Sequence, residues 1–107
     1  MEIKYLEGAL SDLNNITDYY FNRFGYESAK KVYSQIRETI QRLESFPGSG
    51  LPSKDRLLKK LGYREIYSGR FVAVYRIDMD QKIIFINHFA DTQMDYPNLF
   101  KEKERDD

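Results

Sequence analysis

Ser68-Gly-Arg-Phe-Val-Ala-Val-Tyr-Arg-Ile77 is the stretch that decides the fold, and Lys82-Ile-Ile-Phe-Ile-Asn-His-Phe89 follows it closely. Both runs are rich in β-branched and aromatic residues, which favour strands. The dipeptide Ser68-Gly69 predicts a tight hairpin turn after the segment 63–67, because a two-residue connection that ends in Gly suits such turns. Residues 78–81 predict the next turn. The second half of the chain therefore predicts a three-stranded antiparallel meander.

The first half predicts a short strand and two helices. Residues 2–6 alternate in side-chain type, which favours a strand. Apolar residues then recur at three- and four-residue steps on either side of Gly25, which is the pattern of two helices. The first stripe comprises Leu10, Leu13, Ile16, Tyr20 and Phe24, and the second comprises Ala29, Val32, Tyr33, Ile36, Ile40 and Leu43. Two helices joined at Gly25 form a hairpin that needs a sheet to cover it, so the predicted class is α+β.

The segment between the second helix and the meander is rich in turn formers. Pro47 and Gly48 end the helical pattern, and residues 47–55 predict a loop. Three leucines that follow are expected to hold this loop against the body of the domain: Leu57, Leu58 and Leu61.

Length and composition limit the class of protein. The chain has 107 residues, of which 41% are hydrophobic, enough for one core. We therefore expect a single domain over residues 1–100, with a charged, frayed tail at 101–107. Seventeen basic and seventeen acidic side chains cancel, so composition alone does not indicate a nucleic-acid binder. No apolar run approaches the roughly 18 residues of a membrane span, and the start lacks a signal-peptide pattern, so we expect a cytoplasmic protein with no membrane partner.

Alternation along the first hairpin predicts two different faces of the sheet. With Ser68-Gly69 as the turn, the expected pairs are Tyr67 with Arg70, Glu65 with Val72, and Tyr63 with Val74. Arg76 shares the face of these six residues. The opposite face, which we expect to pack on the helices, carries Phe71, Ala73, Tyr75 and Ile77.

The polar face suggests contact with nucleic acid, although a solvated sheet face with a cross-strand ion pair explains the same pattern. Arginines can hold phosphate while the rings of Tyr63 and Tyr67 stack on bases. Lys59, Lys60 and Arg64 form a basic cluster that suits a phosphate backbone, or equally a solvated turn.

His88 is the only histidine, and its role depends on the register of the second hairpin. An even loop would pair it with Phe71 and turn it to the core, whereas an odd loop would pair it with Val72 on the polar face. Packing is the commoner role for a lone histidine. Tyr96 follows the last strand, where it could approach the sheet edge or take part in an apolar clasp formed by 96–100.

The sequence carries no motif for a metal or nucleotide cofactor. It has no cysteine and one histidine, which excludes thiolate sites and histidine ligand clusters. A glycine-rich phosphate loop and a Ser-His-Asp set are also absent. We therefore expect no cofactor.

The order of elements resembles the RelE/ParE superfamily of bacterial toxins, which are the toxin halves of type II toxin–antitoxin pairs. The resemblance covers nearly the whole chain and is most specific at 68–78, with its Tyr-Arg-Ile ending, and at 86–96, with its His and later Asp-Tyr. One departure is Val72, which stands where many members carry an arginine; Arg70 could substitute for it. The neutral charge also departs from what a ribosome-bound enzyme needs.

The resemblance implies a cognate antitoxin and two main targets. RelE-like members cut messenger RNA in the ribosome, and ParE-like members poison DNA gyrase. In such an RNase the ribose 2′-hydroxyl attacks the adjoining phosphate without a metal ion. Glu65 or His88 would accept the proton, Arg70 and Arg76 would stabilise the developing charge, and His88 or Tyr96 would donate a proton.

The favoured prediction is a toxin that acts as a ribosome-associated mRNA endoribonuclease, inhibits translation and arrests growth. One alternative is a non-catalytic inhibitor of DNA gyrase, which needs only a binding surface. The other is a non-toxic module that binds a peptide with the same fold. The groove between the helix pair and the sheet would suit an antitoxin segment that folds on binding.

Overall fold

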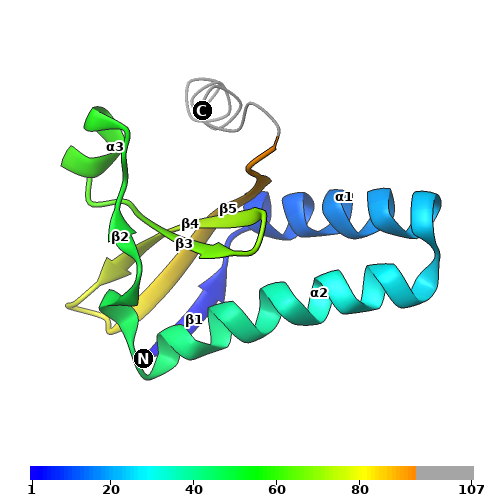
Figure 1. Cartoon of the computed structure of the whole chain (residues 1–107). Coiled ribbons are helices and arrows are strands. Elements are labelled where there is room, and N and C mark those ends of the chain that lie inside the picture. The colour runs from blue at the N-terminus through cyan, green and yellow to red at the C-terminus, as the bar shows by residue number, and fades with distance from the viewer. Residues whose placement is uncertain (94–107) are drawn as a thin grey trace.

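The protein is a two-layer α+β domain in which a helical hairpin packs against one face of a five-stranded sheet (Figure 1). The computed structural model describes residues 1–93, so the predictions for Tyr96, the 96–100 clasp and the 101–107 tail lie outside the described residues. The helices are α1 (Glu7–Phe24), α2 (Tyr26–Gln41) and the short α3 (Arg56–Lys60), with 3-10 turns η1 (Arg42–Glu44) and η2 (Pro47–Ser49). The strands are β1 (Glu2–Tyr5), β2 (Leu51–Pro52), β3 (Arg64–Ser68), β4 (Phe71–Asp78) and β5 (Ile83–Asp91). The predicted fold class, with its N-terminal strand, helical hairpin and meander, is confirmed.

The strands of the sheet lie in the order β1-β5-β4-β3-β2, so the first strand, β1, is the neighbour of the last strand, β5. β1 runs parallel to β5, with Glu2 opposite Ile83 and Tyr5 opposite Ile86. The connection from β1 back into the sheet passes through the helical hairpin, which covers the sheet. The other three pairings are antiparallel, and β2 adds an edge strand of two residues that the sequence did not predict.

The helical hairpin buries its apolar residues only where the sheet lies beneath it. Ala9 and Leu13 of α1 are buried, whereas Leu10 is 46% exposed and Phe24 is 64% exposed. The predicted stripe of the first helix is therefore wrong at these two positions. Leu10 lies about 100° around α1 from the buried Ala9. Phe24 is the last residue of α1, at the end of the hairpin that projects past the sheet (Figure 1). Gly25 joins the helices with φ 93°, a left-handed value that favours glycine.

The second helix follows its predicted stripe more closely. The stripe residues that are buried are Ala29, Val32, Ile36 and Ile40, and Leu43 is buried in η1. Tyr33 is 42% exposed, so its inclusion in the stripe was wrong. It lines a hollow with α1 residues, and its hydroxyl accepts a hydrogen bond from Arg37, whose guanidinium also lies over the ring of Tyr5.

Alternation along β4 is confirmed. Phe71, Ala73 and Tyr75 belong to the core beneath the helices, and Tyr75 is fully buried. On the other face Val74 packs with Leu58 of α3 and with Tyr63. Of the three leucines expected to hold the loop, only Leu58 is buried. Leu57 and Leu61 project from the short helix with 64% and 56% exposure because α3 has room to bury only one side.

The β3–β4 hairpin is displaced by two residues from the predicted register. Tyr67 pairs with Val72 and Glu65 with Val74, so the turn consists of Gly69 and Arg70. Gly69 has φ 60°, and a two-residue turn with a positive φ at its first central position favours glycine there. A shift of two preserves which strand residues share a face, so the faces were right for the residues that lie in β3 and β4, although the pairs were wrong.

Within residues 1–93, no helix has the length and apolar character needed to cross a membrane.

Candidate functional site

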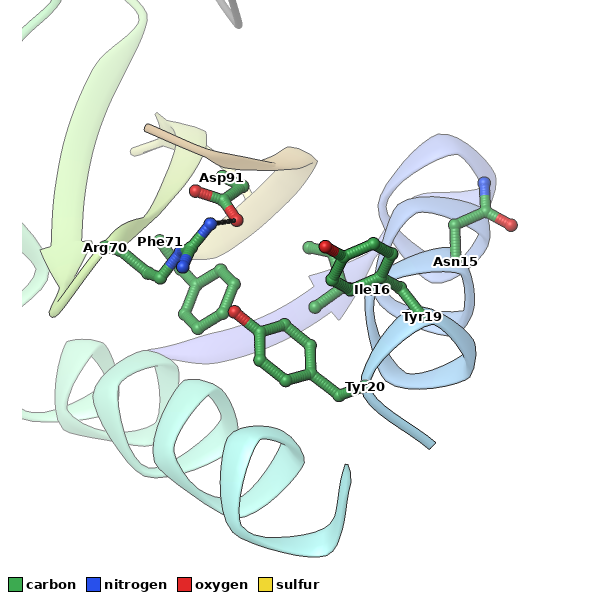
Figure 2. A pocket seen from close by; sticks show the side chains of 7 residues that line it. All are labelled: Asn15, Ile16, Tyr19, Tyr20, Arg70, Phe71 and Asp91. Carbon is green, nitrogen blue, oxygen red and sulfur yellow. Dashed lines mark ion pairs between the residues drawn. The ribbon is translucent and has the colours of Figure 1, made fainter. Parts of the chain in front are cut away.

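A hollow of about 400 Å³ opens between α1 and the end of the sheet where β4 begins and β5 ends (Figure 2). The residues that line it are Asn15, Ile16, Tyr19, Tyr20, Arg70, Phe71 and Asp91. Its exposed lining is mostly apolar, because ring faces and aliphatic carbons form the walls. The sequence suggested a groove for an antitoxin segment between the helix pair and the sheet; this hollow lies between the sheet and one helix of the pair, α1.

Arg70 and Asp91 form the polar rim of this hollow. Arg70 Nη2 lies 2.5 Å from Asp91 Oδ2, and the bond to Asp91 raises the pKa of the guanidinium above its already high value. The carbonyl oxygen of Arg70 accepts hydrogen bonds from the backbone N–H and the hydroxyl of Thr92, both at 2.6 Å. The turn is thus held to the end of β5, and the ion pair sits at a fixed place.

Tyrosine rings form the wall that α1 contributes. The rings of Tyr20 and Phe71 meet edge to face at a centroid distance of 5.8 Å, and Tyr19 meets Tyr20 in the same way at 5.4 Å. Burial raises the pKa of Tyr20, the nearby Arg70 opposes this and Asp91 adds to it. Tyr20 therefore stays protonated at neutral pH and presents a hydroxyl that can donate. Rings with polar tips beside an ion pair suit the binding of a partner's side chain.

The hollow offers little acid–base chemistry. Its carboxylate, Asp91, is bound to a guanidinium, and burial raises the pKa of the Tyr20 phenol. A group that removes a proton needs a free lone pair and a pKa close to the working pH. The arrangement therefore suits the binding of a partner better than the transfer of a proton.

The structure separates Arg70 from the other predicted catalytic residues. Arg70 leaves the strand for the turn and lies on the helix side, so its predicted place beside Glu65 was wrong. By register, Glu65, Val74 and His88 form one row across three strands, and Arg76 lies two residues along β4 on the same face. Glu65 is only 5% exposed and its Oε1 accepts from the Tyr67 hydroxyl at 3.4 Å. The exposed Arg76 lies over the ring of Phe85, 5.8 Å from its centroid.

His88 takes neither of the two expected partners. A β-bulge between Val74 and Tyr75 inserts an extra residue into β5 and pairs His88 with Val74. His88 Nδ1 lies 3.0 Å from Oδ2 of Asp12, and the backbone N–H of Phe89 donates to the same oxygen at 3.1 Å. The imidazole is thus packed against α1, and its Cε1 atom lies close to Gly8.

Asp12 is a residue that the sequence analysis missed. It is 5% exposed and lies between Ala9 and Ile16 on the inner side of α1. The sequence does contain a signal for this position. Asp12 comes three residues after Ala9 and four before Ile16, so helical spacing puts it on the same inward side as these two apolar residues.

The predicted nucleic-acid residues divide into two groups. Lys59 and Lys60 are exposed at the end of α3. Arg64 is engaged elsewhere, because its Nη2 donates to the carbonyls of Gly48 and Gly50 at 3.2 and 2.6 Å. The predicted cluster is therefore split.

The two predicted stacking tyrosines also differ in exposure. Tyr63 is half-buried against Leu58 and Val74. Tyr67 remains 38% exposed, with the ammonium of Lys54 5.4 Å from its ring centroid. Among residues 1–93, no group of three or more acidic or histidine side chains is arranged to hold a metal ion.

Comparisons with known proteins agree with this fold. The model of the family described as ParE toxin of type II toxin-antitoxin system, parDE, matches residues 3–96. The chain is 32% identical over 80 residues to Toxin ParE1 of Caulobacter vibrioides, covering 75% of this chain and 80% of that protein.

Two solved structures carry the same architecture. One is a chain of the chromosomal ParDE toxin–antitoxin system from P. aeruginosa, with a TM-score of 0.71 and 28% identity over 85% of this chain and 95% of that one. The other is a chain of the toxin–antitoxin complex RelBE2 from Mycobacterium tuberculosis, with a TM-score of 0.63 and 17% identity over 84% and 95%, a likeness of fold alone. The chain belongs to the ParE toxins of type II toxin–antitoxin systems, within the RelE/ParE superfamily.

Proposed function

We propose that this toxin acts by binding DNA gyrase and that it has no RNA-cleaving activity. The observation that carries the proposal is the position of Arg70, which lies on the helix side of the sheet in an ion pair, away from Glu65. Cleavage without a metal ion needs a proton acceptor, cations and a proton donor around one phosphate. Arg70 and Arg76 are six residues apart along an extended chain, about 20 Å at roughly 3.3 Å per residue, too far to share one phosphate.

The remaining members of the predicted catalytic set also favour binding over catalysis. Glu65 is buried, and His88 is held by Asp12 on α1. The curated relative carries the name ParE1, and ParE-like members of the superfamily are the ones expected to act on gyrase. A neutral chain also suits a protein target better than a ribosome.

Two assays on the purified full chain separate the candidates. We expect inhibition of gyrase supercoiling with broken DNA, and intact message when the chain is added to translating ribosomes. Message cleavage with unaffected gyrase would overturn the proposal and restore the endoribonuclease, for which Glu65 and Arg76 on one face by register are the supporting observation.

Arg76→Ala tests the catalytic face without disturbing the core, because Arg76 is exposed. A gyrase inhibitor of the proposed kind should keep its growth arrest within about threefold. An RNase that uses this cation should lose roughly 100-fold or more in cleavage rate, as the loss of one stabilising donor does. Arg76→Lys, which keeps the charge, is the matched control. Loss of growth arrest in Arg76→Ala together with loss of message cleavage would favour the enzyme.

We also propose that the hollow beside α1 binds a segment of the cognate antitoxin. Its support is the mostly apolar lining and the fixed ion pair at its rim. Tyr19→Asp places a charge on this wall and should weaken antitoxin binding at least tenfold, while growth arrest without antitoxin is unchanged. Phe46→Asp, at an exposed ring outside the hollow, is the control. Calorimetry with purified antitoxin measures both, and equal affinities would exclude the hollow as the antitoxin site.

A further inference from the structure

A second hollow, of about 420 Å³, lies on the outer side of the helical hairpin. Thr17, Asp18 and Phe21 of α1 line it together with residues of α2, and no residue of the sheet takes part. The α1 residues of the first hollow are a different set, so the two hollows open on different sides of the same helix. The second hollow is near the Gly25 end of the hairpin, which projects past the sheet (Figure 1).

Aromatic rings are exposed in and around this second hollow. Phe21 is 53% exposed, Tyr26 62% and Tyr33 42%. At about 200 Å² per ring, these three side chains offer roughly 300 Å² to solvent. A contiguous apolar patch of this size is often functional on a soluble protein.

The charges that line the hollow are self-complementary. Asp18 lies on α1 and Lys30 on α2, both at this hollow, and in the described part of the chain neither forms a salt bridge. The helices run antiparallel, so a two-fold axis along the groove between them places α1 of one copy over α2 of the other. Asp18 of each copy then faces Lys30 of its partner, which gives two equivalent ion pairs.

The size and the net charge also fit a second copy. The exposed rings of two copies supply about 600 Å² of the roughly 1,000 Å² that a specific interface needs, and the rest of the groove lining adds to this. A chain with no net charge does not repel itself.

We propose that two copies of this toxin associate through the outer faces of their α1–α2 hairpins to form an antiparallel four-helix arrangement. The first hollow, with Arg70 and Asp91 at its rim, stays open on each copy because it lies on another side of α1. The pairing does not depend on the target of the toxin.

Sedimentation of the full chain over a concentration series tests the pairing. The chain is separated from its antitoxin under denaturing conditions, refolded and checked by circular dichroism. We expect a monomer–dimer equilibrium that Phe21→Asp weakens at least tenfold. Phe46→Asp, at a ring that is 67% exposed but lies beyond the opposite end of α2, should leave it unchanged. A monomer at all concentrations, or a dimer that Phe21→Asp does not affect, would overturn the proposal.

Exchanging the charges of Asp18 and Lys30 tests whether the partner that binds at the second hollow is a second copy of this chain. Asp18→Lys and Lys30→Asp should each weaken the dimer about tenfold, because each sets like charges opposite one another. The double variant should restore dimerisation to within about threefold of the original. A double variant weaker than either single variant would contradict the two-fold pairing. So would Phe21→Asp weakening antitoxin binding while leaving the dimer intact.

Discussion

The side chain of Asp12 provides a hydrogen-bond acceptor for the backbone at the edge of strand β5. β1 ends at Tyr5, and the chain turns into α1, so within residues 1–93 the edge of β5 beyond Ile86 has no strand to pair with. Asp12 Oδ2 accepts the N–H of Phe89 at 3.1 Å and replaces the missing backbone partner. The same oxygen holds the imidazole of His88.

Asp12→Ala should lower the free energy of unfolding by about 1–3 kcal/mol, because it leaves a buried N–H without an acceptor. Asp12→Asn keeps an oxygen at the same place and should cost less. Urea unfolding followed by circular dichroism measures both variants. An alanine variant as stable as the asparagine variant would show that the Phe89 bond contributes nothing.

The face of the sheet on which a side chain lies was predictable wherever side chains alternate along a regular strand. Phe71 and Tyr75 face the helices because side chains alternate along a strand, and a shift of two residues leaves this unchanged. The place of Arg70 was not predictable in this way, since it depends on which two residues form the turn. The position of His88 depends on a bulge, for which this sequence gives no local signal.

At the scale of elements, buried polar contacts tie the loop before β2 to the sheet. The hydroxyl of Tyr75 donates to the carbonyl of Pro47 at 2.9 Å and accepts the N–H of Gly50 at 3.0 Å. Arg64 donates to the carbonyl of Gly50 from β3. These hydrogen bonds hold the loop against the sheet directly before β2.

Gly50→Ala should destabilise the protein by about 1–3 kcal/mol, the usual cost of overfilling a packed site. A Cβ at Gly50 would lie 2.7 Å from the backbone oxygen of Glu65 and within the contact distance of the Tyr75 hydroxyl. Gly48→Ala is the matched control, because no atom lies within 4 Å of its Cβ position. Thermal unfolding compares the two. Equal melting temperatures would mean that the loop moves freely from the sheet.

The existence and order of the main elements followed from periodicity, and their pairing only in part. The stripe of α2 was right at Ala29, Val32, Ile36 and Ile40 because a helix packed on a sheet buries every third or fourth residue. The parallel pairing of β1 with β5 was not predicted, since the two strands are far apart in sequence and no local pattern links them.

At the scale of the whole molecule, the helical hairpin has an inner half that packs on the sheet and an outer half, at the Gly25 end, that does not. Residues near Ala9 and Ile40 are buried, whereas the residues around Gly25 are exposed. Local stability follows the density of buried contacts. The outer half should therefore open far more readily than the sheet.

Amide hydrogen exchange should show this division. We expect the slowest exchange in β4 and β5, which have a hydrogen-bonded neighbour on each side, and the fastest helical exchange at residues 21–26. Addition of a binding partner that covers the outer face should slow exchange there and leave β4 unchanged. Uniform protection along α1 in the monomer would contradict the division.

The class of the protein was predictable from the sequence, and its target was not. The motif-like stretches at 68–78 and 86–96 indicated the superfamily, which the comparisons confirm. The target depends on whether a few side chains meet at one point, and a displacement of the hairpin by two residues is enough to separate them.

The pairing of β1 with β5 also sets the order of events while the ribosome makes the protein. Residues 2–5 emerge first, but the strand beside them begins only at Ile83. A nascent chain that has not yet exposed β5 can form its helical hairpin but lacks the centre of its sheet. Harmful activity thus arises only after most of the polypeptide has been translated, and this delay gives a previously made antitoxin time to meet it.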